Sequence, residues 1–269
     1  MEKKVAIITG AAGGIGRKIV EKFIADQYAV VLVDLSEEGM LEANSWLKLD
    51  STDYLVLAGD LTNDDFLQQI VATTLEKWGR IDALINNAMW RRVESIHEST
   101  PENWNLTLAI GITAPAFLSK YVARALIANK QACTIINVSS VMASLTAGYA
   151  SAYSVCKGAI ESLTYELATL YGPRGFRVVA VRPGSVDTSL SNDYSSQENG
   201  NVSSNVQNEI DDRTPLKRAA DPMEIAAAIS WLCSDQASFI TGTTLTIDGG
   251  LTHNFNPYAI KKLIKPNEF

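Results

Sequence analysis

The sequence holds few residues of the types that build metal sites and disulfide frameworks. Its 269 residues include two histidines and three cysteines. The cysteines, Cys133, Cys156 and Cys233, are scattered, odd in number and without the spacing of metal ligands. We therefore expect reduced thiols with structural roles, and no metal site.

Long runs of one charge sign and long apolar runs are also absent. The net charge of -7 is spread along the chain, without the basic block that would follow a phosphate backbone. No apolar run approaches the roughly 18 residues of a membrane span, and the stretch before the first apolar run, residues 1–4, is too short for a signal peptide. These absences argue against nucleic acid and membrane as partners, and we expect a soluble, cytoplasmic protein.

Apolar material is plentiful, since hydrophobic residues make up 46% of the chain, enough for one large core. Short apolar runs, typical of strands buried on both faces of a parallel sheet, alternate with helical patterns. The runs cover residues 5–8, 29–33, 54–58, 83–85, 133–138 and 176–181. This alternation predicts an α/β protein with a single-domain, Rossmann-like, doubly wound parallel sheet of about seven strands and helices on both faces.

Capping patterns predict where two of the helices begin. Thr100 is followed by Pro101, an N-cap and a suitable first residue for a long helix that extends to about Ala128. Thr62 with Asp65 resembles a capping box that opens an earlier helix.

Chemically distinctive residues follow the strand-like runs. They are Gly10, Asp34, Asp60, Asn86, Ser140 and Gly184. Ligands of doubly wound sheets bind beyond the carboxyl ends of the strands. Because structural residues have no reason to gather there, we expect a ligand site at this edge.

The first of these strand ends predicts a nucleotide site. Residues 9–16 read TGAAGGIG between an apolar strand and a helical pattern, so the backbone can pass close to a pyrophosphate at a helix N-terminus. Asp34 lies eighteen residues after Gly16, where its carboxylate can bind both ribose hydroxyls and repel a 2′-phosphate, which favours NAD over NADP. The alternatives are a merely tight turn, and Asp34 or Ser36 as a helix cap. Asp60 can bind an adenine amino group or simply form a turn.

Tyr153 and Lys157 lie four apart in a helical pattern, so both side chains reach one place. A nearby ammonium favours the phenolate form of tyrosine, which makes acid/base chemistry possible at neutral pH. The alternative is a packed ring and a solvated lysine.

Several motifs in order resemble the short-chain dehydrogenase/reductase family. They are TGAAGGIG at residues 9–16, NNA at 86–88, Ser140 thirteen residues before Tyr153, YSVCK at 153–157 and RPGSVDT at 182–188. The resemblance covers nearly the whole chain, to about Leu251. It implies an NAD(P)-dependent oxidoreductase that interconverts a secondary alcohol and a ketone, and a homotetramer or homodimer.

The resemblance also implies roles for individual residues. Tyr153 would be the general acid/base, Lys157 its electrostatic partner and a ribose ligand, and Ser140 the residue that polarises the substrate oxygen. The implied cofactor-binding residues are Gly10, Gly13, Gly14, Ile15, Gly16, Asp34, Leu35, Asp60, Leu61, Asn87, Ala88, Tyr153, Lys157, Pro183, Gly184, Val186 and Thr188, with NAD as the cofactor.

Two positions depart from the family pattern. Gly111 stands where the family has a catalytic asparagine, whose backbone carbonyl holds a relay water at a helix kink. Pro115 has no N–H for the carbonyl of Gly111, so we hypothesise that this pair keeps the kink and the water. A weakened or lost proton relay is the alternative. Met89 replaces a glycine, which indicates a reshaped wall of the cofactor or substrate site.

Three other segments have open roles. Arg91 and Arg92 would meet an anionic substrate or form a surface pair. Residues 189–213 are polar and read alone as a disordered loop, but their position resembles the family's substrate lid. We therefore expect a domain over residues 1–251 that includes this lid, and a C-terminal extension over 252–269 that packs on a neighbouring subunit or frays.

Two other functions remain open at this point. A non-catalytic, dinucleotide-sensing relative is favoured by Gly111 and Met89 and opposed by Ser140, Tyr153 and Lys157. An epimerase or dehydratase with a retained cofactor is the other, although the chain length and the YSVCK context fit it less well.

Overall fold

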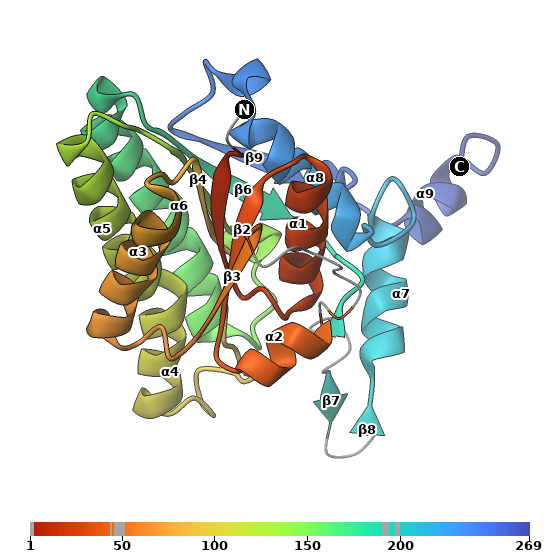
Figure 1. Cartoon of the computed structure of the whole chain (residues 1–269). Helices are drawn as coiled ribbons and strands as arrows, with labels where there is room; N and C mark the ends of the chain where they lie inside the picture. The colour runs from red at the N-terminus through yellow and green to blue at the C-terminus, as the bar shows by residue number, and fades with distance from the viewer. Residues whose placement is uncertain (1–2, 44, 46–51, 190–193, 197–199) are drawn as a thin grey trace.

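The structure is a computed structural model that describes residues 3–43, 45, 52–189, 194–196 and 200–269. Its centre is a 7-stranded sheet in the order β3-β2-β1-β4-β5-β6-β9, and every neighbouring pair is parallel (Figure 1). The strands are β1 (Val5–Thr9), β2 (Ala29–Asp34), β3 (Tyr54–Ala58), β4 (Ala83–Asn86), β5 (Thr134–Val138), β6 (Arg177–Pro183) and β9 (Thr243–Ile247). The predicted doubly wound parallel sheet is confirmed.

The helices cover the two faces of this sheet in separate groups (Figure 1). α3 (Asp64–Trp78), α5 (Ala114–Ala128) and α6 (Ser151–Tyr171) pack on one face, and α1 (Gly14–Ala25), α2 (Glu37–Ala43) and α8 (Pro222–Cys233) pack on the other. Alternate residues of β1 show the division, since Val5 and Ile7 belong to the first core and Ala6 and Ile8 to the second. The sheet is therefore buried on both faces, as its continuous apolar strands require.

The long helix predicted after Thr100 begins as expected but is not uniform. The Thr100 hydroxyl accepts a hydrogen bond from Asn103 N at 3.3 Å. α4 (Pro101–Leu108) then passes into a π-helix (Ala109–Thr113) before α5 begins. Pro115 lies in the first turn of α5, where it removes one backbone donor, and π-bulges are a common cause of helix kinks. The irregularity expected around Gly111 is present.

The capping box predicted at Thr62 is wrong by one residue. Asn63 is the N-cap of α3, and its Oδ1 accepts from the N–H groups of Asp65 at 2.9 Å and Phe66 at 3.4 Å. Thr62 instead donates its own N–H to Asp60 Oδ1 at 2.8 Å. The turn set by Asp60 therefore ends before the helix begins, and the amide side chain takes the capping position.

The polar stretch that composition alone suggests to be disordered contains regular structure. A small antiparallel pair, β7 (Ser195–Ser196) and β8 (Gly200–Asn201), precedes α7 (Ser203–Arg213), while residues 190–193 and 197–199 of the predicted lid lie outside the described residues. The Asp212 side chain of α7 gains a partner from the C-terminal tail, which the sequence pattern does not show.

The tail packs against α7 of the same chain through α9 (Tyr258–Ile264) (Figure 1). Ala259 N donates to Asp212 Oδ2 at 3.3 Å, and Lys217 Nζ lies 3.6 Å from the ring centroid of Tyr258. Fraying, one of the two expected behaviours of the tail, therefore does not describe this part of it.

One described helical stretch, Pro101–Ala128, is long and apolar enough to cross a membrane by length and composition. Its inner residues Leu118, Val122 and Leu126 are fully buried against the sheet and α3. This stretch is therefore a core helix of the α/β domain.

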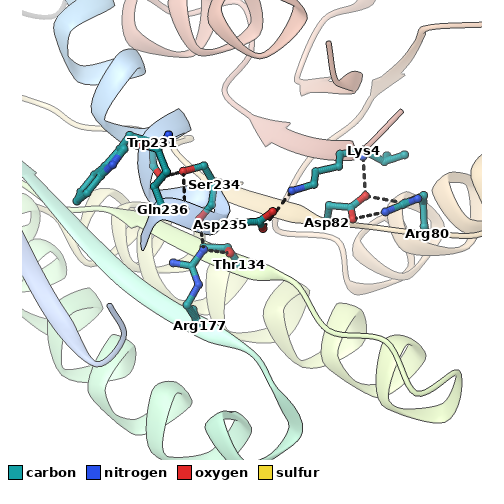
Figure 2. A network of polar contacts seen from close by, with 10 residues as sticks. Lys4, Arg80, Asp82, Thr134, Arg177, Trp231, Ser234, Asp235 and Gln236 are labelled. Carbon is teal, nitrogen blue, oxygen red and sulfur yellow. Dashed lines mark hydrogen bonds and ion pairs between the residues drawn. The ribbon is translucent and has the colours of Figure 1, made fainter. Parts of the chain in front are cut away.

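A polar network closes the edge of the sheet opposite the strand carboxyl ends (Figure 2). Arg177, at the start of β6, donates to Thr134 Oγ1 at 2.8 Å and to the Ser234 carbonyl at 3.3 Å. Asp82 accepts from Val5 N at 2.8 Å and from Arg80. These contacts tie together the beginnings of β1, β4, β5 and β6, so this edge serves stability.

The three cysteines are buried and free. Burial raises the pKa of the Cys133 and Cys156 thiols and raises the pKa of Cys233 to about 12. Their thiols stay protonated at neutral pH, which fits the predicted structural roles.

Candidate active site

A cavity of about 620 Å³ opens at the carboxyl edge of the sheet. Apart from Gly111, all the site residues expected from the sequence line it: Gly10, Gly13, Gly14, Ile15, Gly16, Asp34, Leu35, Asp60, Leu61, Asn87, Ala88, Ser140, Tyr153, Lys157, Pro183, Gly184, Val186 and Thr188. They come from the ends of β1 to β6 and from the start of α6, so the topology gathers them at one place.

The glycine-rich turn is packed too closely for larger residues. Gly10 has a φ of +69°, and a Cβ there would lie 2.8 Å from Asn87 Nδ2. A Cβ on Gly14 would lie 2.7 Å from Thr188 Cγ2, and one on Gly16 would overlap the carbonyl oxygen of Gly10. Because glycines have no side chain, a ligand can approach the backbone at the N-terminus of α1. This arrangement is typical of an anion-binding turn.

Thr9 and Asn87 fix this turn to the end of β4. Thr9 Oγ1 accepts from the N–H groups of Asn87 at 3.0 Å and Ala88 at 3.1 Å. In return, Asn87 Nδ2 donates to the carbonyls of Thr9 at 3.0 Å and Gly10 at 3.2 Å. The Asn87 amide thus satisfies backbone carbonyls of the glycine-rich turn.

The side chain of Asn86, the neighbouring residue, forms hydrogen bonds within the core and not with the turn. Its Nδ2 donates to Asn137 Oδ1 at 2.8 Å and lies 3.3 Å from Ser119 Oγ. Asn137 Nδ2 in turn donates to Thr164 Oγ1 at 2.9 Å. This series of buried hydrogen bonds connects β4, α5, β5 and α6. It fixes how these elements pack, because each buried amide needs its partners once water is excluded.

Asp34 and Asp60 lie at the β2 and β3 end of the cavity. Asp34 accepts from Ala12 N at 2.9 Å and from Leu35 N at 2.8 Å, so its carboxylate links the glycine-rich turn to β2. Ser36 Oγ, and not Asp34, accepts from an N–H group of the following helix, that of Gly39 at 3.1 Å. Asp34 therefore faces the cavity.

Ser140, Tyr153 and Lys157 meet at the β5 end of the cavity. Ser140 Oγ accepts from Met142 N at 3.2 Å, which leaves its hydroxyl proton for another acceptor. Lys157 is 4% exposed, and its Nζ donates to the Val138 carbonyl at 2.6 Å and lies 5.5 Å from the Tyr153 ring centroid. One cavity is therefore lined by Tyr153 and Lys157, which helical spacing pairs, and by Ser140, which the family resemblance adds.

A buried network that the sequence analysis missed lies beneath them. The Ser139 hydroxyl is 3.0 Å from the Lys157 carbonyl and 2.7 Å from Glu161 Oε1. Glu161 also pairs with Arg182, whose Nε donates at 2.8 Å, and these hydrogen bonds raise the pKa of Arg182. Glu161 lies four residues after Lys157 on α6, and this spacing could have predicted that the two side chains share one face of the helix.

Gly111 lies outside the cavity lining, and its missing side chain is explained by two sulfur atoms. A Cβ at this position would overlap Cys156 Sγ and lie 2.8 Å from Met89 Sδ. The thioether of Met89 and the thiol of Cys156 therefore fill the space beside the π-helix. The two departures expected from the sequence, Gly111 and Met89, form one packed unit, to which Cys156 also belongs.

The remaining wall of the cavity comes from the loop after β4 and from the predicted lid. Arg91 lines it, while Arg92 is exposed, so the two arginines do not act as a pair. The lid contributes Tyr194, Gln207 and Ile210, which the sequence analysis did not single out. Their segment lacked a pattern that would place individual side chains.

The sequence is similar to those of known oxidoreductases. The family model described as enoyl-(acyl carrier protein) reductase matches residues 10–252. Glucose 1-dehydrogenase 2 of Bacillus subtilis (strain 168) and meso-2,3-butanediol dehydrogenase of Serratia marcescens are each 31% identical over 251 residues, which is 93% of this chain and 95% of each relative.

The fold is similar to that of solved structures. One of 4-hydroxyisoleucine dehydrogenase complexed with NADH has a TM-score of 0.82 at 28% identity and covers 93% of this chain and 99% of that one. The fold and the matches together define an oxidoreductase that acts on CH–OH groups. The chain belongs to the short-chain dehydrogenase/reductase family, which uses nicotinamide dinucleotide cofactors.

The packing around Gly111 predicts that even a methyl group there is costly. Gly111→Ala should lower the free energy of unfolding by about 1–3 kcal/mol, because the new carbon overlaps Cys156 Sγ and crowds Met89. Adding Cys156→Ala should recover part of the loss. Urea unfolding followed by circular dichroism measures both.

Gly158→Ala is the matched control within a helix. A Cβ there would lie 3.8 Å from the Ala143 carbonyl, so the change should be neutral or stabilise by up to about 1 kcal/mol. Equal effects of the two glycine replacements would contradict the packed unit.

Proposed function

We propose that the protein is an NAD-dependent enzyme that interconverts a secondary alcohol and a ketone. The observation that carries the proposal is the convergence of Ser140, Tyr153 and Lys157 on the cavity wall that faces the glycine-rich turn. We place its activity in the cytoplasm, as the sequence composition suggests.

The cavity fits a dinucleotide. The cradle at Gly10, Gly14 and Gly16 leaves room that a Cβ would fill, which suits a pyrophosphate close to the backbone. Asp34 would hold the adenosine ribose, and Lys157 the nicotinamide ribose. When bound, the nicotinamide supplies the hydride acceptor or donor.

Side chains of the protein would bind the substrate oxygen and transfer its proton. The Tyr153 phenol exchanges a proton with that oxygen, and the Lys157 ammonium lies beside the Tyr153 ring. The Ser140 hydroxyl, oriented by Met142 N, donates a hydrogen bond to the same oxygen. Ser139 and Glu161 hold the backbone of α6 against β5, which keeps these groups in place.

The route by which the proton reaches solvent is part of the proposal. The π-helix at Ala109–Thr113 and the missing N–H of Pro115 support a role for the Gly111 carbonyl in holding a relay water. The packed Met89 supports the alternative in which this relay is weaker. A rate that falls on Pro115→Ala at low buffer concentration, and recovers with buffer, would favour the Gly111 route.

Replacement of Tyr153 separates catalysis from dinucleotide sensing. Tyr153→Phe should lower turnover by at least about 10²-fold through loss of the proton-transferring group, while NAD still raises the melting temperature. NADH formation over a panel of secondary alcohols measures the rate. If the wild-type protein binds NAD but turns over no alcohol or ketone, the sensing alternative is the better one.

Asp34 provides the test of cofactor choice. Asp34→Asn keeps a side-chain oxygen for Ala12 N but removes the charge that would repel a 2′-phosphate. The ratio of kcat/KM for NAD to that for NADP should therefore fall by at least about 10-fold. Asp60→Ala should weaken both cofactors alike, and a similar result for Asp34→Asn would leave Asp34 only a structural role.

We also propose a homodimer or homotetramer, built through the outer faces of α5 and α6. Phe117, Tyr165 and Leu170 expose at least 40% of their surface there, and contiguous exposed apolar groups commonly mark interfaces. Light scattering should give two or four times the 29.2 kDa chain mass. Leu170→Glu should lower the assembled mass, whereas Leu263→Glu on α9 should not; a monomeric wild type would contradict the proposal.

A further inference from the structure

Helix α7 of the predicted lid forms part of the cavity wall but has little apolar packing of its own. Its side chains Gln207 and Ile210 line the cavity. The helix has 11 residues, of which Val206 and Ile210 are apolar, and within this fully described helix only Ser203 is buried. A helix of this length is marginal in water unless other parts of the protein hold it. The position of Gln207 and Ile210 therefore depends on contacts from outside α7.

One such contact comes from the loop after β6. The Ser185 hydroxyl donates to Gln207 Oε1 at 3.0 Å, and Gln207 Nε2 donates to Asp211 Oδ1 at 2.7 Å. Ser185 also lines the cavity, so this contact holds the middle of α7 at the cavity wall. The last turn of the helix, which begins at Ile210, is held by other residues.

The last two carbonyls of α7 accept hydrogen bonds from residues beyond the helix. Lys217 Nζ donates to the Asp212 carbonyl at 2.8 Å, and Asn254 Nδ2 donates to the Arg213 carbonyl at 2.5 Å. Carbonyls in the last turn have no partner within their own helix, and a cation near them also suits the negative end of the helix dipole. Lys217 and Asn254 therefore cap α7.

α9 holds Lys217 and the end of α7 from the side of the C-terminal tail (Figure 1). Lys217 Nζ lies 3.6 Å from the ring centroid of Tyr258 and donates to Asp212 Oδ1 at 3.0 Å. Asp212 Oδ2 accepts from Ala259 N at 3.3 Å. The ring of Tyr258 is packed edge-on against that of Phe269, with centroids 5.6 Å apart. One ammonium, one carboxylate and one aromatic ring thus connect α7 with α9.

The backbone of Lys217 supports the importance of this connection. Its φ of +60° lies in the left-handed region, which residues with a side chain rarely adopt. Such a conformation persists where the surrounding structure holds it. The contacts of the Lys217 side chain with Asp212 and Tyr258 provide that hold.

We propose that the C-terminal segment 254–269 is a positioning element of the substrate site, which acts through the last turn of α7. The segment keeps α7 in the orientation that places Gln207 and Ile210 at the cavity wall. None of its residues, all of which are described, lines the cavity, so Tyr258 and Asn254 are positioning residues. The inference rests on the proposed function, because it takes this cavity to be the substrate site.

A change in the tail should therefore affect the substrate and not the cofactor. The residues proposed to hold the dinucleotide lie on the glycine-rich turn, at the strand ends and on α6, and not on α7. A loosened α7 would withdraw Ile210 from the cavity wall and weaken substrate binding. The proton-transferring group, Tyr153, would stay in place on α6.

Hydrogen–deuterium exchange of the full-length protein tests whether the tail holds α7. Tyr258→Ala and Lys217→Met should each raise the exchange rates of the α7 amides by about 10-fold or more. Tyr258→Phe should keep the wild-type rates, because the aromatic ring remains. Phe255→Ala is the matched control, since this aromatic residue of the tail is 94% exposed, and it should change nothing.

Steady-state kinetics tests whether the position of α7 matters to the substrate. With the secondary alcohol that the wild type oxidises best, Tyr258→Ala should raise KM by about 5-fold or more, while kcat changes by less than about 2-fold. The affinity for NADH should stay the same. In a protein that already carries Ile210→Ala, the same replacement should have a smaller effect on KM, because the contact through which the tail acts is gone.

Three outcomes would overturn the inference. The first is wild-type exchange of α7 in Tyr258→Ala. The second is faster exchange across the central sheet as well, which would show a general loss of stability. The third is an unchanged KM in spite of faster exchange of α7.

Failure of the proposed function would give a different result. A wild type that binds NADH but oxidises no alcohol would contradict the oxidoreductase, while the exchange of α7 would still decide whether the tail holds this helix. Oxidation of alcohols with a KM that does not respond to Tyr258→Ala would support the oxidoreductase and contradict the positioning role of the tail.

Discussion

The burial of the Lys157 ammonium is the constraint on which the site depends. A buried cation is costly unless it is paired, and the Val138 carbonyl at 2.6 Å provides a partner at the end of β5. This bond fixes α6 against the sheet, one turn after Tyr153 and next to Ser140. Glu161 and Arg182 extend the same arrangement to the end of β6, so that one buried polar assembly positions both walls of the cavity.

The unit formed by Met89, Gly111 and Cys156 shows how a family position can change its side chain without collapse of the site. Removal of a side chain at position 111 leaves a void beside α6, and an unfilled void costs stability. Met89 is flexible enough to fill such a gap, and Cys156 completes it. The π-helix forms without an amide side chain at position 111, and Pro115 follows it in the first turn of α5. The departures from the family pattern at positions 89 and 111 are thus structurally coupled, because the two residues pack against each other.

Much of the fold could be predicted from the sequence because its signals are local. Continuous apolar strands, the turn at Gly10 and the helical pairing of Tyr153 with Lys157 each lie within a few residues, and parallel topology then gathers the strand ends at one edge. The contacts that were missed join distant segments. Ser139 meets Glu161 across 22 residues, and Gly111 meets Met89 and Cys156 from two sides. The helix at Ser203 was missed because its side chains bond distant segments, with Gln207 contacting Ser185 and Asp212 contacting the tail.

Arg91 links helix α6 to the predicted lid. Its guanidinium contacts Tyr153, which lies on the fixed helix α6, and Tyr194, which lies in the lid segment. Tyr194 N donates to Ser203 Oγ at 3.1 Å at the start of α7, and α7 packs against the tail through Asp212. Arg91 and Tyr194 therefore join α6 to the start of α7, while α9 contacts the other end of the same helix.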